Sequence, residues 1–467
     1  MTELRLSNTL SGEKEVFEPI EDDRVLLYVC GLTVSDDPHL GHARTWVSFD
    51  VLHRYLEYEG YDVRHVENVT DIDDKIIARA EEEGLTASEV AARYAEQVYD
   101  DMVSLNLRRV DVRPHVTEHV DDIIEMVERL IERGYAYEAD DGVYFDVSEF
   151  DGYGKLSGQR TEELEQGEEG ADKNAHEDFS GWQLADDSPE EEPTRDHPWG
   201  EGRPGWHIEC SAMSTSHLGE TVDIHGGGRD LVFPHHENEI AQSEAATGEE
   251  FARYWLHVGP LRVEDEKMSS SLGNFWTVHD ALEEYDANEV RAFLVSTRYS
   301  KPQRFTRDAL DDGAARWGRI RGAYRACEEA MDSTDARAKE TDENLREAVE
   351  RAREDFFAAM DEDLNTPEAL AALDGIVDAV NSHAEEAPYD YVGLFRAWSA
   401  LGELAGDVLG FDFSRGGDTE RVVESVLALR EEMRSAGEYE TADAVRDALE
   451  DAGVEVQDTE DGATYRL

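Results

Sequence analysis

The stretch VLLYVCG (residues 25–31) is a short, nearly continuous apolar run that ends at a glycine. This pattern is typical of a strand that is buried on both faces of a parallel sheet. After a turn, residues 43–58 show the apolar spacing of a helix, and residues 61–66 resume as a strand. Strand, helix and strand in this order form a β-α-β unit, the building block of a doubly wound parallel sheet. The stretch therefore predicts an α/β fold of Rossmann type.

The pattern changes along the 467 residues and predicts five segments. Residues 1–117 and 201–306 are expected to form the two halves of the sheet domain. Residues 118–200 are expected to be an inserted connective domain, whose Glu- and Gly-rich part would form a flexible, acidic surface. We expect an α-helical bundle over residues 307–412 and a small α+β domain over residues 413–467.

The chain is extremely acidic, with 110 Asp and Glu residues against 44 Lys and Arg residues and a formal net charge of −66. Only seven of the cationic residues are lysines. Such a charge would destabilise a compact fold in dilute salt, whereas about 1 M salt shortens the Debye length to about 3 Å and screens the repulsion. The acidic residues are spread over nearly every segment, whereas a protein that binds basic partners would carry them in blocks. We therefore predict a halophilic protein.

Composition excludes several other classes of protein. Hydrophobic residues make up 40% of the chain, which is enough for packed cores and argues against a disordered acidic chain. The sequence has no run of eighteen apolar residues and no signal peptide, so we expect no membrane segment and a cytoplasmic location. The cysteines Cys30, Cys210 and Cys327 lie far apart, which excludes a disulfide framework and leaves them as ligands or buried thiols.

Two short motifs have the composition of a polyphosphate site. DDPHLGHARTW (residues 36–46) places His39 and His42 where the first strand is followed by a helix, and a helix N-terminus attracts anions. EDEKMSSSLGN (residues 264–274) has a lysine, small hydroxyl residues and Gly-Asn, as in a mobile loop that closes over phosphates. Each motif also has an ordinary explanation: two capping histidines in the first and a polar surface loop in the second.

The stretch FPHHENE (residues 233–239) crowds two histidines and two glutamates into five positions. On a helix that begins after Pro234, Glu239 shares a face with His235 (i, i+4) and with His236 (i, i+3). Cys30 ends the first strand at the sheet edge where α/β folds bind ligands. Zinc accepts thiolate, imidazole and carboxylate ligands that need not be contiguous. The residues thus allow a zinc site, although isolated cysteines are more often buried apolar residues.

Together these motifs resemble a known family. HLGH and KMSSS resemble the signature motifs of the class I aminoacyl-tRNA synthetases. Five longer strings resemble the cysteinyl-tRNA synthetases, in the same order: YVCGLTV (28–34), NVTDIDDKII (68–77), GRPGWHIECSAM (202–213), DIHGGGRDLVFPHHENEIAQ (223–242) and EKMSSSLGNF (266–275). Residues 438–466 are also similar to the C-terminal end of that family. The resemblance therefore covers nearly the whole chain.

The resemblance implies an enzyme that activates L-cysteine with ATP and Mg²⁺ and transfers it to tRNA(Cys), with a catalytic zinc ion that selects the thiol. It implies four zinc ligands, Cys30, Cys210, His235 and Glu239, and leaves His236 and Glu237 outside the site. It implies catalytic roles for His39, His42 and Lys267. For ATP it implies Gly41, Gly226, Gly227, Asp230, Lys267 and Ser270. For the substrate cysteine it implies Gly31, Thr70, Trp206 and His225.

The substrate-cysteine residues also have ordinary explanations. Trp206 could be a core aromatic residue, His225 a strand-end histidine, and Thr70 the cap of a helix that begins at Asp71. One position departs from the family: Ser270 stands where its loop has a second lysine, which leaves Lys267 as the only cation of that loop.

The tail (residues 411–467) has 16 acidic residues and six arginines, a net charge of −10, so its charge does not support RNA binding. Two alternatives stay open: a cysteine:amino-sugar ligase built on the same core, and a non-catalytic zinc- or RNA-binding protein. We expect the protein to be a monomer.

Overall fold

The structure is a computed structural model. It describes residues 3–159, 173–184, 198–263, 266–268, 275–333, 335–337, 341–385 and 387–414, and, further on, 426–427, 430, 433–434, 442, 445–446, 449, 454–459 and 462–466. The chain divides into two compact units, Met1–Phe411 and Asp412–Leu467. No helix in the described ranges is both long and apolar enough to cross a membrane.

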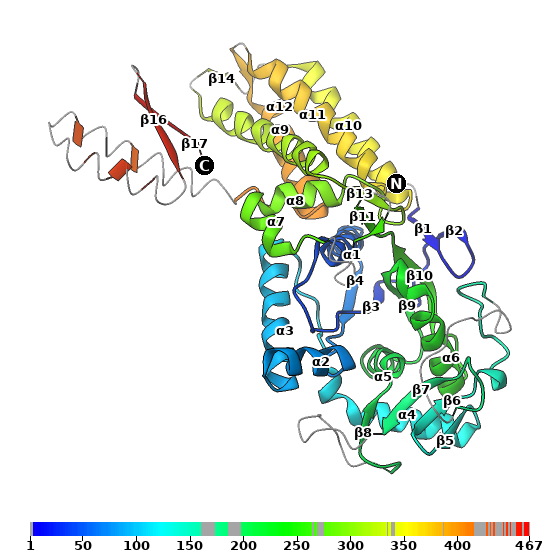
Figure 1. Cartoon of the computed structure of the whole chain (residues 1–467). Coiled ribbons are helices and arrows are strands. Elements are labelled where there is room, and N and C mark those ends of the chain that lie inside the picture. Colours follow the sequence, from blue (N-terminus) through cyan, green and yellow to red (C-terminus); the bar gives the residue numbers. More distant parts are fainter. Residues whose placement is uncertain are drawn as a thin grey trace. The chain divides into compact units, whose positions relative to one another are not determined.

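A parallel sheet of four strands forms the centre of the first unit (Figure 1). Its strands are β3 (Arg24–Val29), β4 (Asp62–Glu67), β9 (Val222–Gly228) and β10 (Ala252–Val258), in the order β10-β9-β3-β4. All three neighbouring pairs are parallel, with Tyr28 of β3 opposite Val66 of β4 and His225 of β9. The predicted α/β fold of Rossmann type is confirmed.

The strand order fixes where a ligand can bind. β3 pairs with β4 on one side and with β9 on the other, so the chain order reverses between β3 and β9. Open α/β sheets bind ligands at the carboxyl ends of their strands, beside such a switch point. Cys30 follows β3 at this edge, and Gly228 ends β9 there.

Helix α1 (Leu40–Tyr58) joins β3 to β4 and begins three residues before the predicted position. His39 is its N-cap, and a reciprocal capping box with His42 extends the helix to Leu40. Ala43, Val47 and other apolar residues of this helix are buried in the core of the first unit. The longer helix brings the HLGH motif to the N-terminus of α1, beside the end of β3.

The connective insertion contains more regular structure than the acidic sequence predicts. Helix α4 (Val120–Arg133) is followed by an antiparallel sheet in the order β5 (Ala136–Ala139), β6 (Gly142–Phe145), β7 (Phe179–Leu184) and β8 (Gly202–Pro204). The prediction of a flexible surface was wrong for β7, because Phe179 and Trp182 are buried in the core. The rest of the acidic part, residues 160–172 and 185–197, lies outside the described residues.

The other strands and helices of the first unit carry some of the residues of the candidate site. The strands are β1 (Arg5–Asn8), β2 (Glu13–Val16), β11 (Leu261–Val263), β12 (Glu266–Lys267) and β13 (Gln303–Phe305). The helices are α2 (Asp74–Glu83), α3 (Ala87–Ser104), α5 (Trp206–Leu218), α6 (His235–Thr247), α7 (Val278–Glu284) and α8 (Ala287–Leu294).

The described residues between positions 307 and 408 are mainly helical, as the sequence predicts. The helices are α9 (Arg307–Asp332), α10 (Glu343–Asp361), α11 (Thr366–Ala384) and α12 (Tyr391–Leu401), followed by a π-helical segment, Gly402–Val408. Short strands β14 (Ala336–Arg337) and β15 (Tyr389–Asp390) pair beside them. Trp317, Phe356, Leu373 and Leu394 are buried between these helices.

The second unit ends in the predicted hairpin. β16 (Glu455–Thr459) and β17 (Gly462–Arg466) pair antiparallel, with Thr459 opposite Gly462 at the turn. Leu427 and Val454 form a small buried cluster in this unit. The helices expected between residues 416 and 453 lie largely outside the described residues.

Candidate active site

A cavity of about 570 Å³ opens at the carboxyl edge of β3 and β9. A volume of this size is typical of small-molecule sites. Most of the residues that the resemblance implies line it: Cys30, Gly31, His39, Gly41, His42, Thr70, Trp206, Cys210, Asp230, His235 and Lys267. Ser270 lies outside the described residues.

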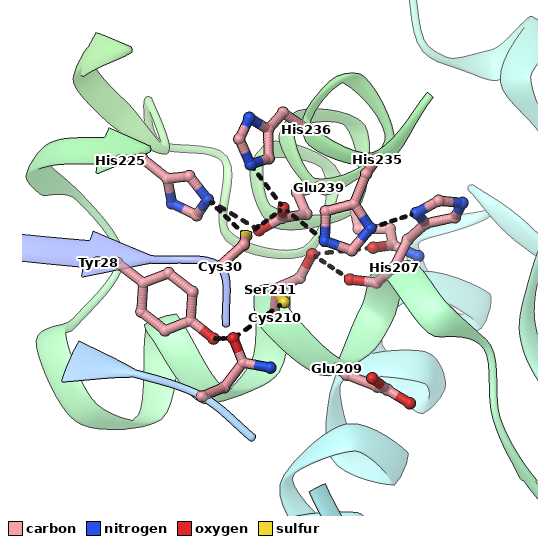
Figure 2. Close-up of polar contacts among 12 residues, drawn as sticks. Tyr28, Cys30, His207, Glu209, Cys210, Ser211, His225, His235, His236 and Glu239 are labelled. Atoms are coloured by element: carbon pink, nitrogen blue, oxygen red, sulfur yellow. Dashed lines mark hydrogen bonds and ion pairs between the residues drawn. The ribbon is translucent and has the colours of Figure 1, made fainter. Parts of the chain in front are cut away.

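One end of the cavity holds four buried side chains of the kinds that bind metals (Figure 2). Cys30 follows β3, Cys210 lies on α5, and His235 and Glu239 lie one turn apart on α6. Their donor atoms all lie within 4.8 Å of one another. Glu239 Oε1 is 3.2 Å from Cys30 Sγ and 3.1 Å from His235 Nε2. Two sulfurs, one imidazole nitrogen and one carboxylate oxygen form a donor set that zinc accepts.

A second set of four donors overlaps the first and combines Cys30 and Glu239 with His225 and His236. His225 Nε2 is 3.1 Å from Glu239 Oε2 and 3.5 Å from Cys30 Sγ. His236 Nε2 is 3.8 Å from Glu239 Oε1. The resemblance leaves His236 outside the site, whereas the structure places its ring at the cluster. Geometry alone therefore permits either set.

Glu237, by contrast, points away from the cluster, as the resemblance implies. Its carboxylate accepts hydrogen bonds from the backbone N–H groups of Gly154, Leu156 and Ser157. It therefore ties α6 to the connective insertion and has no donor role in either metal set.

Each of the two neighbouring histidines is held by a further histidine. His235 Nδ1 lies 2.9 Å from His207 Nδ1, and His236 Nδ1 lies 2.8 Å from His257 Nε2. If His235 presents a lone pair at Nε2 to a cation, its proton is on Nδ1 and is donated to His207. Contacts of this kind fix the ring orientation and the tautomer of a metal ligand.

The charge state of the cluster is set by burial and by the neighbouring side chains. Burial raises the pKa of the Cys30 thiol well above its ordinary value, and Cys210 and Glu239 raise it further. Burial opposes ionisation of Glu239 too, but His225 and His235 lower the pKa of that carboxyl below its ordinary value. A bound divalent cation would instead lower the pKa of the thiols, since a coordinating thiol is deprotonated. The cluster therefore fits a cation chemically.

The other end of the cavity contains the HLGH motif. The His42 N–H donates to His39 Nδ1 over 3.3 Å, and the His39 N–H donates to His42 Nδ1 over 3.2 Å. The two rings stack with their centroids 3.7 Å apart. A Cβ at Gly41 would lie 2.8 Å from the His39 ring, so this position requires a glycine.

Both histidines of the motif are neutral near pH 7. Burial lowers the pKa of His39 to about 4 and that of His42 well below its ordinary value. Because each Nδ1 accepts a hydrogen bond, the proton of each neutral ring is on Nε2. The two residues do cap the helix, but they also keep two N–H donors at its N-terminus, where an anion is favoured.

The expected ATP residues divide into two groups. Lys267 forms an ion pair with Asp230, with its Nζ 2.9 Å from Oδ2, at the cavity. Gly226 and Gly227 are tightly packed: a Cβ at Gly226 would lie 2.3 Å from the Phe49 ring, and one at Gly227 would lie 2.9 Å from Leu231. This packing explains the two glycines without a nucleotide, and it is Gly228 that lines the cavity.

The residues expected around the substrate cysteine surround the metal-ligand cluster. Trp206 is 38% exposed, and its ring centroid lies 4.5 Å from that of His235, so it is not a core residue. His225 is fully buried and stacks on Tyr28. Thr70 does not cap a helix, because α2 begins at Asp74 with Asp73 as its N-cap. The Thr70 hydroxyl instead donates to Glu209 Oε2 over 3.1 Å.

Three residues at the site escaped the sequence reasoning. The Asn68 side-chain oxygen accepts the Gly31 N–H over 2.9 Å and lies 3.5 Å from Cys210 Sγ. The rule that selected Cys30, a position just after a parallel strand, also applies to Asn68 after β4. His207 and Glu209 precede Cys210 in the same short string, but no local pattern distinguishes them from ordinary helix residues.

Comparison with known proteins agrees with the family resemblance of the sequence motifs. Residues 16–315 match the family "tRNA synthetases class I (C) catalytic domain", and residues 355–414 match the "DALR domain". A methionyl-tRNA synthetase from Mycobacterium tuberculosis, in complex with methionyl-adenylate, has a similar fold at 16% identity, with a TM-score of 0.63 over 84% of this chain and 93% of that one.

Three proteins related in sequence are much more similar to this chain than that methionyl-tRNA synthetase is. The cysteine–tRNA ligase of Haloarcula marismortui is 52% identical over 99% of this chain and 100% of its own length. That of Halobacterium salinarum is 51% identical over 99% of both chains, and that of Thermococcus onnurineus is 44% identical over the same shares. With its class I catalytic domain and its acidic surface, the chain therefore belongs to the cysteine–tRNA ligases, in their halophilic type.

Proposed function

We propose that this protein activates L-cysteine with ATP and then transfers the cysteinyl group to the 3′-terminal adenosine of tRNA(Cys). In the first step a carboxylate oxygen of cysteine attacks the α-phosphorus of ATP, and the bond to the bridging oxygen of pyrophosphate breaks. The observation that carries the proposal is one cavity that has a thiol-rich donor cluster at one end and the HLGH histidines at the other. Such a cavity can hold the two substrates side by side.

We assign the metal site to Cys30, Cys210, His235 and Glu239, with one zinc ion per chain. Zinc bound there would bind the thiol of cysteine much better than the hydroxyl of serine. An apolar pocket alone discriminates between such similar side chains only by about 10- to 200-fold. The support for this set over the overlapping one is its second thiolate donor, Cys210. Replacing His235 by Ala should then abolish zinc binding, whereas His236→Ala should weaken it by about 10- to 100-fold, as expected for a side chain that supports a ligand. Equal losses in metal titrations would contradict the assignment.

The HLGH residues are proposed to stabilise the transition state of activation. The Nε2–H groups of His39 and His42 would donate hydrogen bonds to phosphate oxygens as negative charge develops on them. Lys267 would bind the phosphates of ATP, which enters with Mg²⁺, and Asp230 would meet the adenosine. Ser270 completes the set of residues that the resemblance implies for ATP. Gly226 and Gly227 belong to that set as well, and we propose that their role is to allow close packing next to the nucleotide site.

The cysteine substrate is proposed to lie between Gly31 and the ring of Trp206. Thr70 and His225 would complete the pocket, Thr70 through the hydroxyl that now bonds to Glu209 and His225 through its packing beside Cys30. These residues orient the amino acid so that its carboxylate faces the α-phosphate.

The remaining parts of the proposal concern the RNA and the assembly. We assign the catalytic domain to residues 1–117 and 201–306, the connective insertion to 118–200, a tRNA-binding helical bundle to 307–412 and an anticodon-binding domain to 413–467. The DALR match at residues 355–414 and the C-terminal hairpin support tRNA over an amino-sugar as the acceptor. We further propose a cytoplasmic monomer.

The decisive experiment is an ATP–pyrophosphate exchange assay in molar KCl with cysteine and serine compared, followed by charging of tRNA(Cys). We expect exchange with cysteine only, and charging of the tRNA. Exchange without charging would support the amino-sugar ligase, and absence of both would support a non-catalytic protein.

A further inference from the structure

Lys75, near the start of α2, is a cation of the cavity wall that the sequence reasoning did not assign. It is one of only seven lysines in a chain of net charge −66, and it lines the same cavity as Lys267. Its side chain is exposed, and its ammonium forms no hydrogen bond or ion pair with any residue in the described part of the chain. A lysine without such a partner is notable where acidic residues outnumber basic ones by 110 to 44.

Lys75 lines the cavity together with residues of both proposed substrate sites, Trp206 and His42. Its Nζ lies 5.9 Å from the centroid of the Trp206 ring, which borders the proposed cysteine pocket. Burial lowers the pKa of His42, and His39, Lys267 and Lys75 lower it further. His42, Lys75 and Lys267 all line the same cavity. A phosphate bound to His42 would therefore lie within the field of both lysines.

The other cations of the cavity already have carboxylate partners. Lys267 pairs with Asp230 over 2.9 Å. Arg79, one turn after Lys75 on α2, pairs with Asp36 over 2.9 Å and contacts Glu82 over 3.5 Å. Lys75 is thus the lining cation whose charge is available to a new anion without breaking an ion pair. A flexible lysine stem lets its ammonium follow the phosphates during the reaction.

We propose that Lys75 binds the phosphates of ATP and the departing pyrophosphate together with Lys267, and so supplies the cation that Ser270 does not provide. This inference rests on the proposed function and extends it by one substrate-binding residue. The charge it contributes stabilises the negative charge that the pyrophosphate gains as its bond to the α-phosphorus breaks.

The test is ATP–pyrophosphate exchange in molar KCl with the wild type, Lys75→Met, Lys75→Arg, Ser270→Lys and the double variant Lys75→Met/Ser270→Lys. Lys75→Met should lower kcat/KM for ATP by about 10- to 100-fold, the range for one charge-assisted hydrogen bond, with the KM for cysteine unchanged within about twofold. Lys75→Arg should keep most of the activity, and Ser270→Lys should restore most of what Lys75→Met loses. Lys301→Met, which removes an exposed lysine outside the cavity wall, is the matched control and should behave as wild type.

A second readout does not depend on turnover. ATP stabilises a protein that binds it, so saturating ATP should raise the Tm of the wild type more than that of Lys75→Met. The inference is overturned if Lys75→Met keeps the wild-type kcat/KM for ATP, if its loss falls on the KM for cysteine, or if Ser270→Lys restores nothing. An inactive wild type would instead overturn the proposed function itself, so the two failures are distinguishable.

Discussion

The two ends of the cavity differ in how exposed their charged and metal-binding side chains are. We call the end with the four-donor cluster the metal end and the end with Lys267 and Asp230 the phosphate end. At the metal end, Cys30, Cys210, His235 and Glu239 are each at most 8% exposed. At the phosphate end, the side chains of Lys267 and Asp230 are 46% and 57% exposed. Molar salt screens exposed charges over distances of about 3 Å but reaches buried groups much less.

This difference explains where the halophilic chain departs from its family. The sequence keeps all four residues that the resemblance implies as zinc ligands, whereas Ser270 stands where the resemblance implies a second lysine in the loop that contains Lys267. An exposed cation at the cavity wall can be replaced by another lysine, as we propose for Lys75, whereas a buried donor has no such substitute among the residues that line the cavity. The four predictions below, ordered by effect, measure how far this contrast extends.

The largest effect is expected from removing one donor at the metal end. Cys210→Ser replaces a thiolate by a hydroxyl, a far poorer zinc ligand, and should lose the metal and at least about 100-fold in cysteine activation. Zinc content and pyrophosphate exchange measure the two losses. Cys327→Ser is the matched control, since Cys327 is buried in α9 and has no place in either donor set. Full activity of a metal-free Cys210→Ser protein would remove the basis of the contrast.

The next effect is expected at the phosphate end. Lys267→Met should lower the rate of activation by about 100-fold, because a donor aimed at developing charge typically contributes 100- to 1,000-fold. The rate of exchange at several KCl concentrations measures it, and Lys267→Arg should recover part of the loss. A change of less than twofold would show that the exposed end supplies no cation to ATP.

Much of this arrangement follows from local sequence patterns. The apolar run before Cys30 fixes strand β3, the spacing in FPHHENE puts His235 and Glu239 on one helix face, and the HLGH motif lies at a helix start. Each of these depends on neighbours within a few residues, where periodicity and capping rules apply.

The remaining features depend on contacts between distant segments. Thr70 reads as a helix cap, but its hydroxyl bonds to Glu209, which is 139 positions away. The sequence also does not show that His207 contacts His235 or that His257 contacts His236. β7 lies within an acidic stretch, where only two buried aromatic residues mark it. No local rule contains these partners, so the fold has to be known first.

A smaller effect is expected from the buried histidines of the HLGH motif, and it is a pH effect on stability. The pKa of His39 falls from an ordinary 6.5 to about 4 in the folded state. Between these values the unfolded state binds more protons, so stability decreases as the pH falls from 6.5 to 4. We expect a loss of stability on the order of 1 to 3 kcal/mol across this pH range.

Thermal melts of the wild type and His39→Asn in molar KCl, at pH 7.5 and pH 4.5, isolate this contribution. The many carboxylates titrate in both proteins and cancel in the comparison. The wild type should lose more Tm on acidification than His39→Asn does. An identical acid shift would show that His39 takes up its proton in the folded state as easily as in the unfolded one, which its burial argues against.

The smallest effect is expected from breaking the ion pair of the phosphate end. Asp230→Asn removes the partner of Lys267, but pairs this exposed contribute about 0 to 1 kcal/mol, and molar salt reduces that further. We expect the free energy of unfolding in molar KCl to change by less than about 0.5 kcal/mol, measured by guanidinium titration at constant ionic strength. A change above about 1 kcal/mol would mean that Lys267 is held in place as firmly as the buried ligands are. The lysine could then not exchange Asp230 for the phosphates at little cost, and the contrast between a rigid metal end and an adaptable phosphate end would fail.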